Sequence, residues 1–148
     1  MTVRLAVPPR SRAAPLWDRT LLRKRAQQVL RAMGHAAAEL SVTLAKDAEM
    51  AALNEAWRQR PRPTDVLSFS LLEGEHTPFR GNLLGEVVIG LWVAERQARA
   101  ARRCLDDELA RLLIHGVLHL LGHDHVRSQD AKRMRCEERR LWGLVKAP

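Results

Sequence analysis

Residues 115–125 contain four of the six histidines in the chain. His115 and His119 are four residues apart, so on an α-helix they lie one turn apart on the same face, with about 6 Å between their β-carbons. Gly122 follows at a position where a left-handed residue usually ends a helix, and the turn behind it can bring His125 to the same point. Three imidazoles that leave a fourth position to water form the ligand set of a catalytic zinc ion.

Other readings of this stretch stay open. A structural zinc ion normally has four protein ligands, mostly cysteine, but neither Cys104 nor Cys136 lies here. Sites with three histidines also accept nickel, cobalt or iron, so the sequence does not fix the metal. His123 points either to solvent or to substrate. Asp124 is placed to accept the second ring N–H of a ligand histidine, as metal-bound imidazoles usually require.

The histidine spacing also occurs in the metzincin peptidases, whose pattern is H-E-x-x-H-x-x-G-x-x-H. The glutamate of that pattern is the general base, and Gly116 occupies its position here. Zinc lowers the pKa of its bound water to about 7, so hydrolysis remains possible without that glutamate. The spacing therefore indicates a hydrolase and argues against a peptidase.

An apolar helix must carry these histidines. The acidic residues 106–108 suit its N-terminus, where negative charge is favourable. The positions expected to make it the most buried helix are Leu109, Leu112, Leu113, Val117, Leu120 and Leu121.

The remaining pattern predicts strands interleaved with helices. Strands are expected near residues 3–7, 40–44, 64–71 and 84–90, the last of them interior because it is almost continuously apolar. Helices are expected at 18–33, from 47 to about 58, at 92–103, 106–121 and 130–144. The second of these helices should bury Met50, Leu53 and Trp57. The predicted fold class is α+β: a mixed sheet of about four strands, with helices packed around the helix that carries the histidines.

Length and composition place limits on the protein. With 148 residues, 46% of them hydrophobic, the chain is expected to form a single domain over residues 1–148. It contains no apolar run as long as a membrane span, and its start has no apolar signal-peptide segment. We therefore expect a cytoplasmic protein without a membrane partner, and two free thiols in a reducing compartment.

Positive charge predominates, with 25 Lys and Arg against 17 Asp and Glu, a net charge of +8 and a pI of about 10.9. Such a chain attracts polyanions through phosphate contacts and counterion release, so nucleic acid is the natural partner. A codon bias toward arginine would raise the charge with no partner at all. Residues that either bind phosphate or form a solvated surface are Arg96, Arg99, Arg102, Arg103, Arg127, Lys132, Arg133 and Arg135.

Three stretches in addition to the histidines carry a family likeness. They are residues 53–58 (LNEAWR), 63–69 (PTDVLSF) and 85–89 (GEVVI), followed by 115–125 (HGVLHLLGHDH). Together, and in this order, they resemble the bacterial YbeY family of metal-dependent endoribonucleases over about residues 40–134. The chain departs from the family at Glu86, where aspartate is usual, and at His123, where tyrosine is common.

This resemblance implies one zinc ion held by His115, His119 and His125. It also implies that Arg58 is needed for activity, that the substrate is single-stranded ribosomal RNA, and that the protein acts in small-subunit RNA 3′-end maturation and ribosome quality control. The ribosome is then the expected partner, with ribosomal proteins or a GTPase as further possible partners. Arg58 would stabilise charge on the scissile phosphate; the sequence alone favours a solvated cation at a helix end, and the family resemblance reverses that preference. Asp65 either caps a turn or takes part in the site.

Two other functions are kept as alternatives. A metallopeptidase-like hydrolase would use the same histidines but lacks the glutamate at Gly116. A non-catalytic ribosome-assembly factor would hold zinc only as a structural ion, and loss of a ligand would then unfold it.

Overall fold

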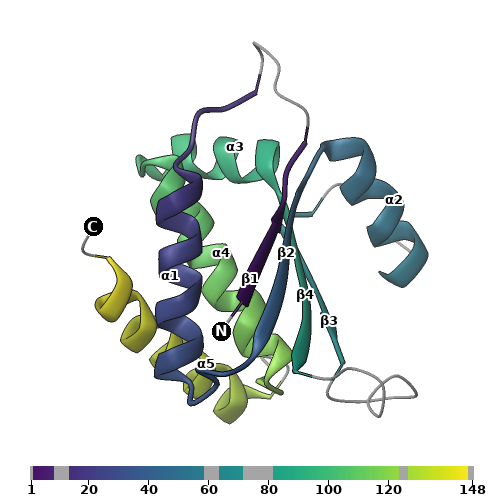
Figure 1. The fold of residues 1–148 in the computed structure, drawn as a ribbon. Coiled ribbons are helices and arrows are strands. Elements are labelled where there is room, and N and C mark those ends of the chain that lie inside the picture. The colour runs from purple at the N-terminus through teal and green to yellow at the C-terminus, as the bar shows by residue number, and fades with distance from the viewer. Residues whose placement is uncertain (1, 9–13, 59–63, 72–81, 124–126, 147–148) are drawn as a thin grey trace.

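The order of strands and helices along the chain is the one that the sequence predicts (Figure 1). The structure is a computed structural model that describes residues 2–8, 14–58, 64–71, 82–123 and 127–146. Within these ranges the elements are β1 (Thr2–Ala6), α1 (Arg19–Ala32), β2 (Glu39–Ala45), α2 (Asp47–Arg58), β3 (Val66–Ser70), β4 (Leu83–Gly90), α3 (Leu91–Ala101), α4 (Leu105–Leu120) and α5 (Ser128–Val145).

The strands form one mixed sheet with the order β1-β2-β4-β3. β1, β2 and β4 are parallel, and β3 pairs antiparallel with β4 at the edge. The apolar strand β4 is therefore interior, as predicted. On β3, Ser68 lies opposite Val87 and Phe69 lies opposite Glu86, so successive β3 side chains face opposite sides of the sheet. The predicted α+β class with a four-stranded mixed sheet is confirmed.

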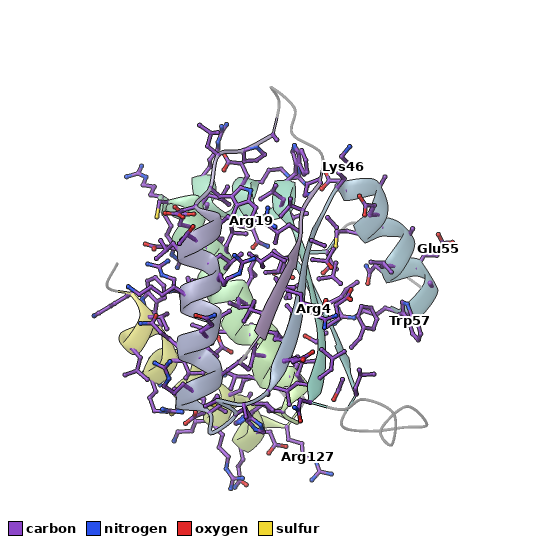
Figure 2. The ribbon with its side chains drawn as sticks, viewed as in Figure 1. Arg4, Arg19, Lys46, Glu55, Trp57 and Arg127 are labelled. Atoms are coloured by element: carbon purple, nitrogen blue, oxygen red, sulfur yellow. The ribbon has the colours of Figure 1, made fainter. Side chains whose placement is uncertain are left out.

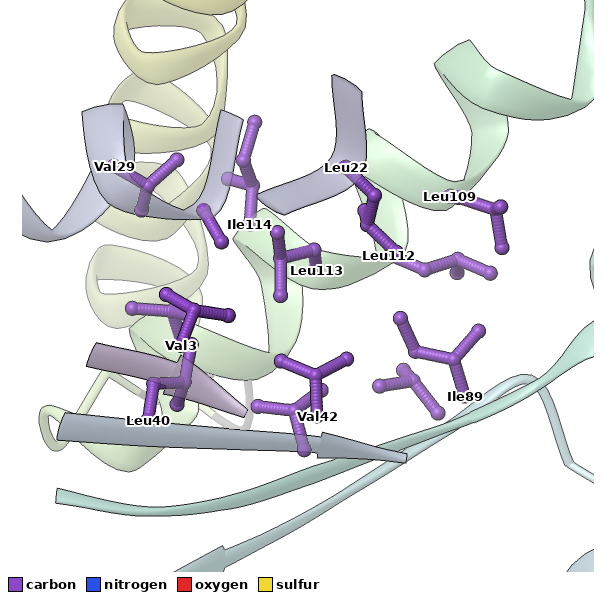
Figure 3. Close-up of a cluster of buried hydrophobic side chains, with 14 of the residues drawn as sticks. Val3, Leu22, Val29, Leu40, Val42, Ile89, Leu109, Leu112, Leu113 and Ile114 are labelled. Atoms are coloured by element: carbon purple, nitrogen blue, oxygen red, sulfur yellow. The ribbon is translucent and has the colours of Figure 1, made fainter. Parts of the chain in front are cut away.

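Helix α4 lies at the centre of the larger core, as expected for the helix that carries the histidines. It contacts α1, α3, α5, β3 and β4, and α1, α4 and α5 lie on one side of the sheet with α2 on the other (Figure 1). Its apolar face packs on the inward side chains of the parallel strands (Figure 3). Side chains that meet there include Leu40, Val42, Ile89, Leu109 and Leu113. Burial of this kind provides most of the stability of such a helix, because the apolar area leaves water.

A smaller core lies under α2 on the opposite face of the sheet. Met50 is fully buried there against Leu67 and Val88, with Leu53 partly buried beside them. Trp57 was predicted to be buried too, and this is wrong: it is 68% exposed at the C-terminal end of α2 (Figure 2). Its ring meets Phe69 edge-on at 5.4 Å between centroids. Phe69 belongs to β3, which is the edge strand of the sheet that the described residues form.

Cys104 and Cys136 are both exposed free cysteines, as predicted. Among the helices of the described ranges, none combines the length and the apolar character needed to cross a bilayer.

Arg25 joins α1 to α4 and to the end of α5. Its side chain is almost fully buried, and its guanidinium pairs with Asp107 at 3.1 Å. The same guanidinium donates to the backbone oxygens of Asp106 and Lys146, at the beginning of α4 and just beyond α5. It also lies 5.6 Å from the centre of the Trp142 ring. One residue therefore fixes the relative positions of α1, α4 and α5.

Replacing Arg25 with methionine should lower the free energy of unfolding by about 2 kcal/mol, because the apolar stem is kept while several hydrogen bonds to a buried cation are lost. Thermal denaturation should show a fall in Tm of roughly 4–8 °C. Lys24→Met, at an exposed position of the same helix, is the control and should leave Tm nearly unchanged. An equal Tm for both variants would contradict this account of Arg25.

Candidate functional site

The C-terminal end of α4 carries two of the predicted metal ligands. After Leu121 the chain leaves the helix through a Schellman turn, in which the N–H of His123 donates to Leu118 O at 2.9 Å and that of Gly122 donates to His119 O at 3.1 Å. Gly122 has a φ of +95°, in the left-handed region that favours glycine. The predicted role of Gly122 as a helix terminator is therefore confirmed.

The imidazole rings of His115 and His119 converge on one point. Their Nε2 atoms lie 3.1 Å apart, with ring centroids at 4.6 Å and planes inclined by 72°. Two nitrogen ligands of a tetrahedral zinc ion with bonds of 2.0–2.1 Å lie about 3.3 Å apart. The two rings thus have close to the separation that a shared ion requires.

Glu138 holds the other side of the His115 ring. Its Oε1 lies 3.3 Å from Nδ1 of His115 and accepts the N–H of that nitrogen. This hydrogen bond keeps the pKa of the Glu138 carboxyl below its usual value, against the opposing effect of burial. With the proton on Nδ1, the lone pair of Nε2 faces the space shared with His119. A carboxylate on the far nitrogen is the usual support of a metal-bound histidine, so the donor set fits a metal ion.

Sequence reasoning missed Glu138. It lies 23 residues after His115, on a different helix, among several other charged residues of α5. No spacing in the sequence separates it from its neighbour Glu137, which pairs instead with Arg140 at 2.7 Å. Only the packing of α5 against α4 distinguishes the two carboxylates.

The two histidines open onto a cavity of about 400 Å³ at the edge of the sheet. Its lining comes from α2, from β3 with the residue before it, and from α4: Arg58, Asp65, Val66, Ser68, Ser70, His115 and His119. Arg58 is the last residue of α2, which lies on the opposite face of the sheet from α4. The structure thus brings Arg58 and Asp65 together with the two histidines around the edge strand.

Asp65 has the geometry of a capping residue. One carboxylate oxygen accepts the N–H of Val66 at 2.8 Å, and the other accepts from the side chain of Gln97 at 3.3 Å. Its backbone oxygen accepts the N–H of Gly90 at 2.8 Å. Of its two predicted roles, these contacts favour the structural one, since both oxygens are already engaged beside the cavity.

Strand β3 is tied directly to the backbone of α4. The hydroxyl of Ser68 donates to Gly116 O at 2.9 Å, and the hydroxyl of Ser70 donates to Leu120 O at 3.1 Å. Gly116 allows this approach, because a β-carbon there would lie 2.6 Å from Val87 Cγ1 and 3.2 Å from Ser68 Oγ. The position that holds glutamate in metzincins therefore faces the sheet at close range and has no room for a carboxylate side chain.

The other predicted site residues lie elsewhere. His123 lines a separate cavity of about 660 Å³ with residues of α5, including Lys132 and Glu137. Asp124 and His125 lie outside the described residues. Within residues 2–8, 14–58, 64–71, 82–123 and 127–146, no group of three His, Cys, Asp or Glu side chains is arranged to hold a metal ion. The described part of the site supplies two histidine nitrogens.

Comparison with known proteins decides the family. The sequence model of the family described as Endoribonuclease YbeY matches residues 12–145. The chain belongs to the YbeY family. This confirms the resemblance based on the three sequence stretches and the histidines. Glu86, where the chain departs from the usual aspartate of the family, does not line the histidine cavity. Its carboxylate accepts the hydroxyl of Ser41 at 3.4 Å.

Curated YbeY relatives match over most of the chain. The protein named Endoribonuclease YbeY from Anaeromyxobacter sp. (strain Fw109-5) is 49% identical over 95% of this chain and 70% of its own length. Those of Syntrophotalea carbinolica and Geobacter metallireducens are 42% and 34% identical, over 84% and 97% of this chain and 85% and 96% of their own. The solution structure of TM1509 from Thermotoga maritima has a TM-score of 0.58 at 23% identity, covering 98% of this chain and 92% of that one. That last likeness concerns the fold.

Two glycine substitutions should have opposite effects on stability. Gly116→Ala should lower the free energy of unfolding by about 1–2 kcal/mol, because the added β-carbon pushes α4 from β4. Gly143→Ala, in α5, meets no atom within 4 Å and should raise it by up to about 1 kcal/mol through helix propensity. Urea denaturation measures both. A stabilised Gly116→Ala would show that the helix and sheet have more space than the contacts indicate.

Proposed function

We propose that this chain is a zinc-dependent endoribonuclease that cleaves single-stranded RNA, with ribosomal RNA as its substrate. The endoribonuclease class follows from membership of the YbeY family. The observation that carries the proposal is the meeting of His115 and His119 with Arg58 around one cavity. Its cellular role would be maturation of the small-subunit RNA 3′ end and ribosome quality control, with the ribosome as partner.

His115, His119 and His125 are the proposed zinc ligands. The separation of the first two Nε2 atoms and the carboxylate behind His115 support this assignment. When bound there, zinc supplies Lewis-acid chemistry, which polarises a phosphate oxygen and activates water as a nucleophile. Asp124, Asp65 and His123 are assigned to the surroundings of the ligands rather than to the ligand set.

Arg58 is the proposed phosphate-binding and charge-stabilising residue. It belongs to the lining of the histidine cavity and is exposed at the end of α2, where a substrate can reach it. A guanidinium presents two N–H donors in one plane and meets two phosphate oxygens at once. As the scissile phosphate gains negative charge, this cation stabilises it more than it stabilises the ground state.

Asp65 is proposed as a positioning residue. Its carboxylate oxygens accept from Val66 and Gln97, so it holds the start of β3 at the cavity. Ser68 and Ser70 follow on that strand, with their hydroxyls engaged on α4. These contacts support a rigid wall against which the RNA backbone is oriented.

The alternatives are less well supported. A peptidase needs a general base where Gly116 stands, and a β-carbon there would already clash with Val87. A non-catalytic assembly factor needs zinc only for its fold. It would give no reason for Arg58 to line the same cavity as His115 and His119. The net charge of +8 suits a polyanionic substrate rather than a neutral peptide.

Metal content and cleavage of single-stranded RNA, measured together, test the proposal. His119→Ala should lose zinc and cleavage while remaining folded. His119 lies at the C-terminal end of α4, and the side chains that α4 buries in the core belong to other residues. Arg58→Ala should keep its zinc and lose about 100-fold or more in kcat/KM. Arg31→Ala, an exposed arginine of α1, is the matched control and should cleave normally.

Two results would count against the enzyme. If His119→Ala and Arg58→Ala both cleave like wild type, the activity belongs to a contaminant. If His119→Ala unfolds, as circular dichroism would show, zinc is structural and the assembly-factor alternative is favoured.

Glu138→Gln should weaken zinc binding about 10–100-fold, because the amide no longer offers His115 an ionised acceptor. Competition with a chromogenic chelator measures the affinity. Glu137→Gln, one residue earlier on α5 and paired with Arg140, is the control and should bind zinc like wild type. Equal affinities for the two variants would rule out support of the ligand by Glu138.

A further inference from the structure

A second cavity, of about 410 Å³, lies between α4 and α5. Its lining residues are Arg111, Ile114, Arg135, Glu138, Arg139 and Trp142. Three guanidiniums therefore face one carboxylate. Over the described residues, none of these three arginines forms an ion pair with a carboxylate, whereas Arg99 and Arg140 each pair with a glutamate of their own helix. Excess positive charge in a concave site favours an anionic ligand.

The tryptophan in this cavity positions a cation. The guanidinium of Arg111 lies 5.7 Å from the centre of the Trp142 ring, and that of the buried Arg25 lies 5.6 Å from it. These contacts hold Arg111 in place by attraction to the ring electrons. Two guanidiniums thus already lie against the Trp142 ring. The cavity is therefore suited to bind a charged group of a ligand rather than to stack a nucleobase on this ring.

The cavity lies beside the proposed active site, and a hydrogen bond between Glu138 and His115 links the linings of the two. Arg111, His115 and His119 follow one another at intervals of four residues on α4, so each lies about 6 Å from the next along one face. Glu138 lines this cavity and also accepts the N–H of His115. The arginines of the cavity therefore lie next to the carboxylate that supports the proposed metal ligand. On α5, Arg135 and Arg139 are also one turn apart.

We propose that this cavity, which we call the arginine cavity, binds a backbone phosphate of the RNA next to the scissile one. This inference rests on the proposed function, because it takes the scissile phosphate to lie beside His115, His119 and Arg58. The strand then crosses Glu138 and places a neighbouring phosphate over Arg111 and Arg139. Guanidinium forks match phosphate oxygens, and the contact carries no base preference.

An acidic protein segment is the rival ligand, but the position of the cavity favours RNA. A nucleic-acid strand carries a phosphate at every step, so any strand bound at the histidines must bring a second phosphate nearby. An acidic segment would have no reason to lie within one helical turn of a metal ligand.

The test compares two double variants that remove the same charge. Arg111→Gln/Arg139→Gln empties the arginine cavity of two cations, and Lys24→Gln/Arg31→Gln removes two exposed cations from α1, which lines neither cavity. Zinc-loaded protein is titrated against a labelled single-stranded oligoribonucleotide. Single-turnover cleavage gives the half-saturating concentration and the limiting rate, and fluorescence anisotropy gives Kd at several salt concentrations.

The arginine double variant should raise the half-saturating concentration about tenfold, with the limiting rate within about twofold of wild type. The slope of log Kd against log salt should fall by about 1.4, as expected for two lost contacts to a single strand. Arg111→Lys/Arg139→Lys should recover part of the affinity, and the α1 variant should behave like wild type. Zinc content should be equal in all of them.

Equal RNA affinities for the arginine and α1 variants would overturn the inference while leaving the nuclease proposal intact. The same holds if polyglutamate binding, but not RNA binding, depends on the arginine pair, since the cavity would then serve an acidic protein. A wild type that binds RNA without cleaving it would instead overturn the proposed function, and the anisotropy comparison would still decide whether the cavity binds RNA.

Discussion

The close contact between α4 and the edge of the sheet is the constraint on which the site depends. Hydroxyls of Ser68 and Ser70 donate to backbone oxygens of Gly116 and Leu120, within the same turns of α4 that carry the histidines. Because Gly116 has no side chain, the helix can approach the strands closely enough for these bonds. The distance between β3 and the part of α4 that carries both histidines is thus set by short contacts to the helix backbone. It does not depend on the rotamers of long side chains packed between the helix and the strand.

The position of β3 at the edge of the sheet explains how residues from both faces meet. In the interior of a sheet, the strands separate the helices on the two faces. At an edge, the last residue of α2 can reach around the strand, so Arg58 lines the same cavity as His115 and His119. An edge also leaves one side open, which suits a polymer that must enter and leave without being threaded. Within the described residues no strand pairs with the outer edge of β3, and β3 is only five residues long, which limits its tendency to pair with other chains.

Local geometry made part of the site predictable from the sequence. The interval of four residues and the glycine after it correctly predicted where His115 and His119 lie relative to each other, because a helix fixes both. Glu138 could not be predicted, since its contact depends on how α5 packs on α4. Arg58 could be predicted as a site residue only from the family resemblance. Its position beside the histidines depends on the order of the strands in the sheet, which hydrophobic periodicity does not reveal. The exposure of Trp57 was predicted wrongly for the same reason: it depends on β3 being an edge strand.

Electrostatics connects the two cavities to one kind of chemistry. Cleaving a phosphodiester concentrates negative charge on phosphate oxygens, whereas cleaving a peptide needs a base to move a proton from water to a leaving amine. Cations line both cavities, with Arg58 at one and Arg111 and Arg139 at the other, whereas the contacts at Gly116 leave no space for the base that the second reaction needs. Glu138 lies between the cavities, and its hydrogen bond with His115 keeps it ionised. This carboxylate therefore supports the ligand histidine and, because it is ionised, also offsets part of the positive charge of Arg111 beside it.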